Sequence, residues 1–200
     1  PIVSVARDHD GNRLPAGGTI RESYIQVQFE ALGAARGHAL LDGVERTLRD
    51  VRLAVPDIAA LKRKMSAAAE ALANAPANAA PADEIEEAAA FLRWLEDDNF
   101  TFLGARDYDF HRTKDGGFVA DEPLVLSETG LGLLRDPARY VLRRGDEPSV
   151  LTAEIKRFIE EPLPLIVSKS NLRSTVHRRA AADYIGVKRY DANGVPIGET

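Results

Sequence analysis

The sequence predicts an α+β fold, in which helices and antiparallel strands form separate layers. Segments with apolar residues at every second position alternate with segments that repeat them every three or four positions, but no strict strand–helix–strand rhythm runs along the chain. No internal repeat of solenoid length is visible. The 200 residues, 44% of them hydrophobic and 28% charged, are enough for one or two domains that each bury a core.

Composition excludes several classes of protein. The chain has no cysteine, which rules out a disulfide scaffold, thiolate metal sites and thiol catalysis. A net charge of −5 argues against a dedicated nucleic-acid binder, and no apolar run approaches the roughly 18–20 residues of a membrane span. Nothing reads as a signal peptide, so we expect a cytoplasmic location and no membrane partner. Because the sequence starts at Pro1 and stops directly after a strand-like run, we expect it to be part of a longer protein.

Two strands and two helices are expected in the first part of the chain. Period-two patterns predict strands at residues 2–5 and 24–29. Apolar residues at steps of three and four predict one amphipathic helix over 40–55 and a second over 58–72. Asp57 precedes the second helix and is expected to cap it.

Residues 74–82 form the one low-complexity stretch of the chain. The segment contains two prolines and no large side chain, so we expect it not to pack. It is therefore predicted to be a linker and the boundary between two domains.

The second part is predicted to mix helices with several strands. Asp83, with Glu86 three residues later, has the pattern of a capping box that opens a helix. Four aromatic residues of one parity, between Phe100 and Phe110, predict a strand with one aromatic face. Further elements are expected as a hairpin turn at 114–117, a helix at 153–160, and strands at 140–142, 165–168, 184–190 and 195–197.

The familiar catalytic motifs are missing. There is no phosphate-binding loop and no zinc-protease motif. Residues 130–135 match a dinucleotide fingerprint in part, but arginine stands in place of the third glycine and no strong strand precedes, which favours a structural turn. Ser168 and Ser174 lie near His177 without a glycine-flanked elbow. The histidines have no ligand spacing: His9, His38, His111 and His177. We predict no catalytic residue, no cofactor site and no metal site in this chain.

Two clusters of charge leave alternatives open. Three acids at the end of a helix, Glu96, Asp97 and Asp98, could bind a divalent cation, but a solvated helix end is the favoured interpretation because no further oxygen ligands are spaced around them. Between residues 168 and 190 the chain carries six basic residues against one acid, Asp183, a local charge of +5. The basic residues are Lys169, Arg173, Arg178, Arg179, Lys188 and Arg189.

The basic cluster has two competing interpretations. With Asn171 and several hydroxyl groups between the basic residues, it suits a carboxylate or phosphate ligand. Alternatively, its charges meet the acidic segment 83–98, within the chain or across a subunit interface. Nucleic acid is the least favoured partner, because exposed aromatic residues are not interleaved with the charges.

Several blocks of the sequence resemble the N-terminal part of the large bacterial NAD-specific glutamate dehydrogenases. The blocks occur in the same order as in that family and cover nearly the whole chain. The most specific is residues 168–178 followed by 183–189. The others are residues 2–8 with 22–23 and 50–52, residues 87–104, and residues 130–135. The sequence departs from the family pattern at Ala105 and at 179–182.

The resemblance implies an α+β fold of ACT-like (ferredoxin-like) modules, with antiparallel sheets that carry helices on one face and a helical connector between modules. Residues 1–73 would be the end of one module plus the connector, 74–82 the linker, and 83–200 most of a second module. It also implies that the parent enzyme oxidises L-glutamate with NAD, and that the catalytic and NAD sites lie in a downstream domain of the same polypeptide.

By this resemblance the chain would serve regulation or assembly, with no catalysis of its own. ACT-like modules bind amino-acid effectors and associate into homo-oligomers, so the candidate effector residues are Lys169, Asn171, Arg173 and Arg178, together with Asp8 and Asn12 in the first module. The alternative is a docking scaffold of the same enzyme that binds no ligand.

Overall fold

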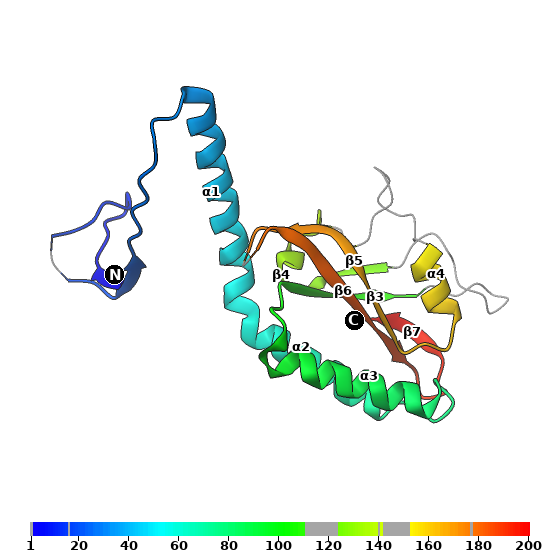
Figure 1. Ribbon diagram of the computed structural model, residues 1–200. Coiled ribbons are helices and arrows are strands. Elements are labelled where there is room, and N and C mark those ends of the chain that lie inside the picture. The colour runs from blue at the N-terminus through cyan, green and yellow to red at the C-terminus, as the bar shows by residue number, and fades with distance from the viewer. Residues whose placement is uncertain (1, 16, 111–123, 140, 142–152, 177) are drawn as a thin grey trace. The chain divides into compact units, whose positions relative to one another are not determined.

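The computed structural model describes residues 2–15, 17–110, 124–139, 141, 153–176 and 178–200 (Figure 1). The chain divides into two compact units, Pro1–Leu41 and Asp42–Thr200. The expected strand at 140–142 and hairpin turn at 114–117 fall on residues outside this description, apart from residue 141.

The first unit is built on one antiparallel hairpin. Strand β1 (Ile2–Val5) pairs with β2 (Ile20–Ser23), with Ile2 opposite Ser23. The prediction of β1 is confirmed, but the strand expected at 24–29 is wrong. Its apolar side chains are exposed, Ile25 at 84% and Val27 at 72%. Period-two patterning makes a strand only where a neighbouring strand or a core covers one face, and the described part of this unit offers neither to these residues.

Three helices follow the first hairpin. Helix α1 (Ala34–Ala54) leads through the short helix η1 (Val55–Asp57) into α2 (Ile58–Ala73), and α3 (Ala82–Trp94) continues into η2 (Leu95–Asn99). The predicted helices are therefore confirmed. In the second unit, however, the apolar stripe of α1 is exposed at Val44 and Leu48, each at 48%. Only the last turn of α1 is buried, at Asp50 and Ala54.

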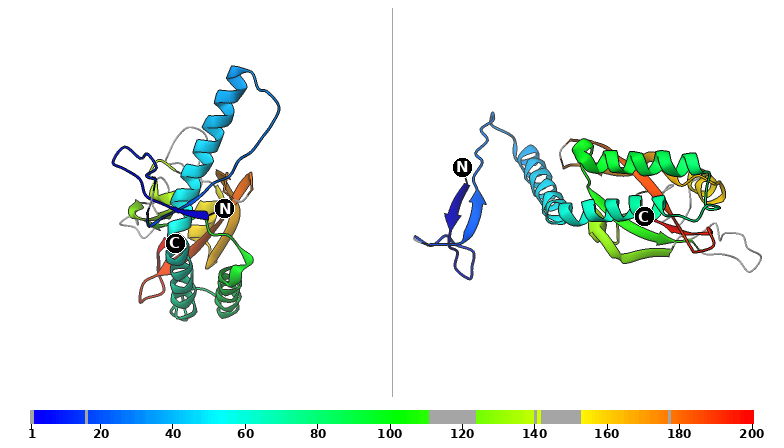
Figure 2. Two further views of the ribbon diagram at one scale, coloured as in Figure 1. Left: turned by 90° about the vertical axis from the view of Figure 1, so that its left-hand side faces the viewer. Right: turned by 90° about the horizontal axis from the view of Figure 1, so that it is seen from below.

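The segment 74–82 is not the linker that its composition suggested. It connects α2 to α3, which pack side by side (Figure 2). Ala79 and Ala80 are buried, and the Asn78 side chain donates a 2.8 Å hydrogen bond to the Asn193 carbonyl. Small side chains allow the two helices to turn closely, so the low complexity reflects a tight connection within one unit. The boundary between the compact units lies at Leu41/Asp42 instead.

The second unit contains a five-stranded antiparallel sheet. Its strands are β3 (Gly104–Asp109), β4 (Leu124–Gly132), β5 (Leu165–Ser174), β6 (Ala180–Tyr190) and β7 (Pro196–Glu199). The order across the sheet is β4-β3-β7-β6-β5, so the last strand lies in the middle, between two hairpins. The α+β class is confirmed by this sheet and its helices.

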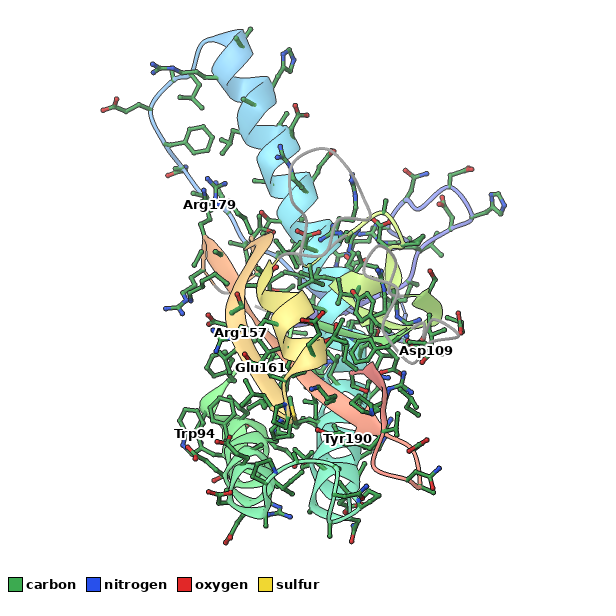
Figure 3. All side chains as sticks on the ribbon, turned by 90° about the vertical axis from the view of Figure 1, so that its right-hand side faces the viewer. Trp94, Asp109, Arg157, Glu161, Arg179 and Tyr190 are labelled. Carbon is green, nitrogen blue, oxygen red and sulfur yellow. The ribbon has the colours of Figure 1, made fainter. Side chains whose placement is uncertain are left out.

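Helices cover both faces of the sheet, not one as expected. On one face Val187 of β6 joins Leu72, Leu92 and Leu95 of the helical pair in a buried cluster. Tyr184 has the opposite parity on the same strand and packs with Ile159 of α4 (Ala153–Glu160), the helix that the sequence predicted at these residues. Figure 3 shows α4 lying against β5 and β6. The sheet is thus the middle of three layers.

The order of elements also differs from that of a ferredoxin-like module. That fold has two βαβ units, whereas here α2 and α3 precede the sheet and β5, β6 and β7 follow one another as a meander. Among the described residues, α4 is the one α-helix that separates two strands of the sheet. The antiparallel α+β architecture holds, without the connectivity that the resemblance implied.

Two acidic side chains join the end of α1 and the start of α2 to the sheet region. Asp57 does not cap α2; its carboxylate accepts hydrogen bonds from the Gly132 amide at 2.7 Å and from Arg135 Nε at 2.5 Å. Asp50 accepts from Arg139 at 2.5 Å and from the Thr175 hydroxyl at 2.7 Å. The capping box predicted at Asp83 is likewise absent, since α3 begins at Ala82 without a side-chain cap.

Candidate docking groove between β3 and β6

Strand β7 fills only one end of the gap between its two neighbours. It pairs with β3 at Tyr108 and Asp109, and with β6 from Lys188 to Tyr190. The Val187 and Thr200 backbones exchange two further hydrogen bonds of 2.9 Å. Among the described residues, no strand pairs with the rest of these two edges, residues 104–107 of β3 and 180–186 of β6.

A cavity of about 560 Å³ lies between the two unpaired edges. Its floor on the helical side is apolar and includes Met65, Phe102 and Ile185. Charged side chains from well-separated parts of the chain also line it: Lys64, Asp98, Arg106, Arg178 and Asp183. We name this cavity, together with the two strand edges, the β3–β6 groove.

Several of the polar groups in the β3–β6 groove already form hydrogen bonds with neighbouring residues. The Ser170 hydroxyl donates to the Val141 carbonyl at 2.8 Å, and the Ser174 hydroxyl to the Val176 carbonyl at 2.6 Å. The buried Arg106 guanidinium donates to the carbonyls of Leu134, Asp136 and Arg139 and so holds the turn after β4. This structural role of Arg106 was not identified from the sequence. The available signal was a single arginine at a strand position that faces the core.

A buried titratable cluster closes the β7 end of the groove. The Tyr184 hydroxyl donates to Glu199 Oε1 at 2.5 Å, and Glu199 Oε2 has no partner among the described residues. Burial raises the pKa of Glu199 to about 7, although Tyr184, Lys188 and Arg189 each oppose the shift. Burial also raises the pKa of Tyr184 and lowers that of Lys188 to about 8.

The buried Lys188 ammonium contacts two neighbouring groups. Its Nζ donates to the Glu161 carbonyl at 2.6 Å and lies 4.7 Å from the centre of the Phe158 ring. The cluster of Tyr184, Lys188 and Glu199 can hold a proton inside the sheet.

The residues of the predicted basic cluster are spread along two strands. Arg179 and Tyr190 lie at opposite ends of β6 (Figure 3), a separation of about 30 Å for eleven residues of strand. Arg189 pairs with Asp109 at 2.5 Å near one end, while Arg178 lines the β3–β6 groove near the other. One small ligand cannot contact both ends, so the cluster is not a single site.

The four candidate effector residues of this region are placed as follows. Lys169 forms an ion pair with Asp183 across β5 and β6. Arg173 is exposed on β5, and neither it nor Arg178 makes a side-chain hydrogen bond or ion pair within the part of the chain described here. The side chain of Asn171 lies outside the described residues. Only Arg178 of these side chains lines the groove.

The two candidate effector residues of the first unit bind to each other within one loop. The Asp8 carboxylate accepts hydrogen bonds from the Asn12 amide at 2.7 Å and from Asn12 Nδ2 at 3.2 Å. These hydrogen bonds lower the pKa of Asp8. Both side chains close a turn in the connection between β1 and β2.

The acidic segment 83–98 is not the partner of the basic cluster in the described residues. Its last acids contact α2 instead: Asp98 pairs with Lys62 at 2.5 Å, and Glu96 accepts a hydrogen bond from Ser66. Asp98 also adopts a left-handed backbone, with φ of 57°. Within the described part of the chain, no group of three or more histidine, aspartate or glutamate side chains is arranged to hold a metal ion.

The partial dinucleotide motif at 130–135 is a strand end followed by the turn η3 (Leu133–Arg135). Gly132 has φ of 57°, and a Cβ there would collide with the Leu103 carbonyl. Gly130 and Gly132 therefore both allow close approach of backbone segments. Arg135, in place of the third glycine, binds Asp57. The segment is a turn, as predicted, but a strand precedes it, β4, which the sequence did not indicate.

Comparison with known proteins identifies relatives of the whole chain. A protein of Halomonas elongata is 35% identical over 208 residues, and one of Pseudomonas aeruginosa is 31% identical over 209 residues. Both are NAD-specific glutamate dehydrogenases. Each alignment covers 99% of this chain but 12% of the dehydrogenase, so the chain corresponds to a small segment of these enzymes.

No family model matches the chain, and no solved structure is significantly similar to it. None of the helices in the described residues combines the length and the apolar character that a membrane crossing requires. The glutamate dehydrogenases thus provide the link from this segment to a function.

Proposed function

We propose that the chain is a non-catalytic segment of an NAD-dependent glutamate dehydrogenase of the cytoplasm. The whole enzyme would convert L-glutamate, NAD and water to 2-oxoglutarate, ammonia and NADH. The supporting observation is the similarity to two NAD-specific glutamate dehydrogenases over 99% of this chain. The chain spans 12% of those enzymes. By the family resemblance described above, a downstream part of the polypeptide would bind NAD and glutamate and carry the chemistry.

Within that enzyme, the role we propose for the segment is assembly. The β3–β6 groove carries this proposal, since two strand edges that face each other across an apolar cavity form a seat for an extended chain. Such docking would attach the segment to the catalytic part or to another subunit of a homo-oligomer.

A regulatory role is the second candidate, supported by a different observation. Arg178 and Asp183 both line the groove and carry opposite charges. A guanidinium and a carboxylate are the groups that would hold the carboxylate and the ammonium of an amino-acid effector. Lys169, which already pairs with Asp183, would compete with the ammonium. This role does not require the ferredoxin-like connectivity.

The assembly role is tested in the full-length dehydrogenase with Ala182→Lys. Ala182 lines the groove, so a lysine there would obstruct docking, whereas Val167→Lys on the exposed part of β5 provides the matched control. We expect Ala182→Lys alone to lower the melting temperature of the enzyme if the docked chain comes from the same subunit, or to change the oligomeric mass measured by light scattering if it comes from another subunit. Turnover per correctly assembled enzyme should be unchanged. Loss of turnover with assembly intact would contradict a non-catalytic role.

The effector role is tested separately with Arg178→Ala and Arg173→Ala. Calorimetric titration of the full-length enzyme with each amino acid should show saturable binding that Arg178→Ala abolishes and Arg173→Ala retains, since Arg173 is exposed away from the groove. No binding by the unmodified enzyme would leave assembly as the role of the segment.

A further inference from the structure

The geometry points to a specific occupant of the β3–β6 groove: a strand that extends β7 beyond Thr200, contributed by the same polypeptide. We propose that this strand lies between β3 and β6 and makes the five-stranded sheet continuous. The inference rests on the proposed function, because it identifies the chain that docks in the groove, and it adds the direction and the register.

Backbone groups of β6 point toward the position that such a strand would occupy. The Lys188 amide bonds to Pro164 beside β5, whereas the Val187 amide bonds to Thr200 beside β7. In an antiparallel ladder successive residues alternate between their two neighbours. The pairing of β5 with β6 is regular from Val187 to Asp183, so the backbone groups of Ile185 and Asp183 point into the groove.

Both walls of the groove specify the same register. Glu199 lies opposite Lys188 on one side and Tyr108 on the other. Continuing these two pairings, the first residue after Thr200 lies between Gly186 and Arg106. The third then lies between Tyr184 and Gly104. Each position after Thr200 therefore has one backbone partner on each wall of the groove, as a strand between two antiparallel neighbours requires.

The side-chain environment also alternates as a strand requires. Positions two and four after Thr200 would face the helical layer, where Met65, Ala68 and Phe102 line the cavity. Positions one and three would face Tyr108, Leu134 and Tyr184 on the other side. A strand covered on both faces is expected to be apolar at most positions.

The strand is proposed to come from the same polypeptide because β7 already runs in the right direction. The paired Thr200 backbone directs the chain along the groove, and the aligned segment covers 12% of the related dehydrogenases, so most of their length lies outside it. A second copy of the chain would have to displace or abut β7 to reach the same edges.

A disulfide cross-link in the full-length protein tests the register. This chain contains no cysteine. The fifth residue after Thr200 should lie opposite Ala182 in a pair without backbone hydrogen bonds, where Cα atoms are about 4.5 Å apart and a disulfide can form. We expect Ala182→Cys to cross-link to a cysteine at that fifth position under mild oxidation. A cysteine at the fourth position, on the opposite face, provides the control and should not react.

Each other outcome contradicts the inference. A cross-link between two chains would show that a second copy supplies the strand, and a cross-link to the fourth position would show a different register. If neither forms, hydrogen exchange on the unmodified protein decides: the amides of Asp183 and Ile185 should exchange on the order of 100-fold more slowly than an unpaired edge allows. Fast exchange there overturns the inference. If Ala182→Lys still changes assembly in that case, the proposed function survives without it.

Discussion

At the scale of single residues, Asp57 shows how a buried carboxylate can serve tertiary structure in place of a local cap. Its side chain, 8% exposed, accepts hydrogen bonds from Gly132 and Arg135, which lie more than seventy positions later in the chain. The Arg135 guanidinium and the Gly132 amide lower the pKa of Asp57 to about 2.

We expect Asp57→Ala to lower the free energy of unfolding at pH 7 by about 2–3 kcal/mol, the typical cost of losing charged hydrogen bonds. Because the pKa of Asp57 is depressed in the folded state, its contribution is present above about pH 4 and is lost as the pH falls toward 2. Urea unfolding at several pH values measures both effects. Asp42→Ala, at an exposed acid of α1, is the control and should change stability by less than about 0.5 kcal/mol. An equal loss in both variants would contradict this role.

Glu199 is expected to show the opposite dependence on pH. Burial raises its pKa to about 7, so between about pH 4.5 and 7 the folded state binds more protons than the unfolded state, and stability falls as the pH rises. Glu199→Gln removes the ionisable group and should stabilise the protein at pH 8 by on the order of 1–3 kcal/mol, with no gain at pH 4. Thermal unfolding across this range measures the difference. Glu160→Gln, at an exposed position of α4, should show no such trend, and a similar trend there would exclude Glu199 as its cause.

At the scale of elements, two glycines of the second unit should respond oppositely to the same substitution. Gly43 lies inside α1 with open space at its Cβ, whereas Gly194 has φ of 74° and its Cβ would lie 2.6 Å from Asn78 Oδ1. Gly43→Ala should stabilise by up to about 1 kcal/mol through helix propensity. Gly194→Ala should destabilise by about 1–2 kcal/mol because L side chains disfavour that backbone. Denaturant midpoints of the two variants, measured together, check the sign of each effect; stabilisation by Gly194→Ala would contradict the packing of the 74–82 turn.

Helices were more predictable than strands in this chain, for a physical reason. The periodicity of α4 marks residues 153–160, which are the bounds observed, because a helix satisfies its backbone locally. A strand depends on a partner. Residues 24–29 alternate well between apolar and polar side chains but have no partner strand in the described part of their unit. Strand β6 extends beyond the apolar residues 184–190 that predicted it, because β5 pairs with it as far as Ala180. The pairing of Glu199 with Tyr108 could not be anticipated from either local pattern.

The candidate site was predictable only in part for a similar reason. Charge counting found Lys169, Arg178 and Asp183 as neighbours in sequence, but strand geometry spreads the cluster along β6. The groove itself arises from incomplete pairing between segments ninety residues apart, and no local motif encodes that.

At the scale of the whole molecule, we expect a protease to cut first in the irregular segment between β2 and α1, and not in the 74–82 turn. Residues 24–32 have no regular structure and expose Ile25, Val27 and Phe29, whereas the 74–82 turn buries Ala79 and Ala80. We expect brief digestion with proteinase K to cleave 24–32 well before 74–82, as mass spectrometry of the fragments would show. Gly194→Ala, which disturbs the turn, should narrow the difference. Early cleavage within 74–82 of the unmodified chain would restore the linker interpretation.

The central position of β7 constrains how the sheet can form during synthesis. The β3–β4 and β5–β6 hairpins each pair residues that emerge from the ribosome close together in time, whereas β7 appears after both. Until it arrives, the two hairpins have no strand to join them, and each presents an open inner edge. Strand β7 follows β6 after five residues, so the β5–β6 hairpin meets its partner almost at once, whereas the inner edge of the β3–β4 hairpin stays open while α4, β5 and β6 are synthesised. An unpaired edge exposed for that time can pair wrongly, so the nascent chain is most prone to misfolding just before β7 emerges.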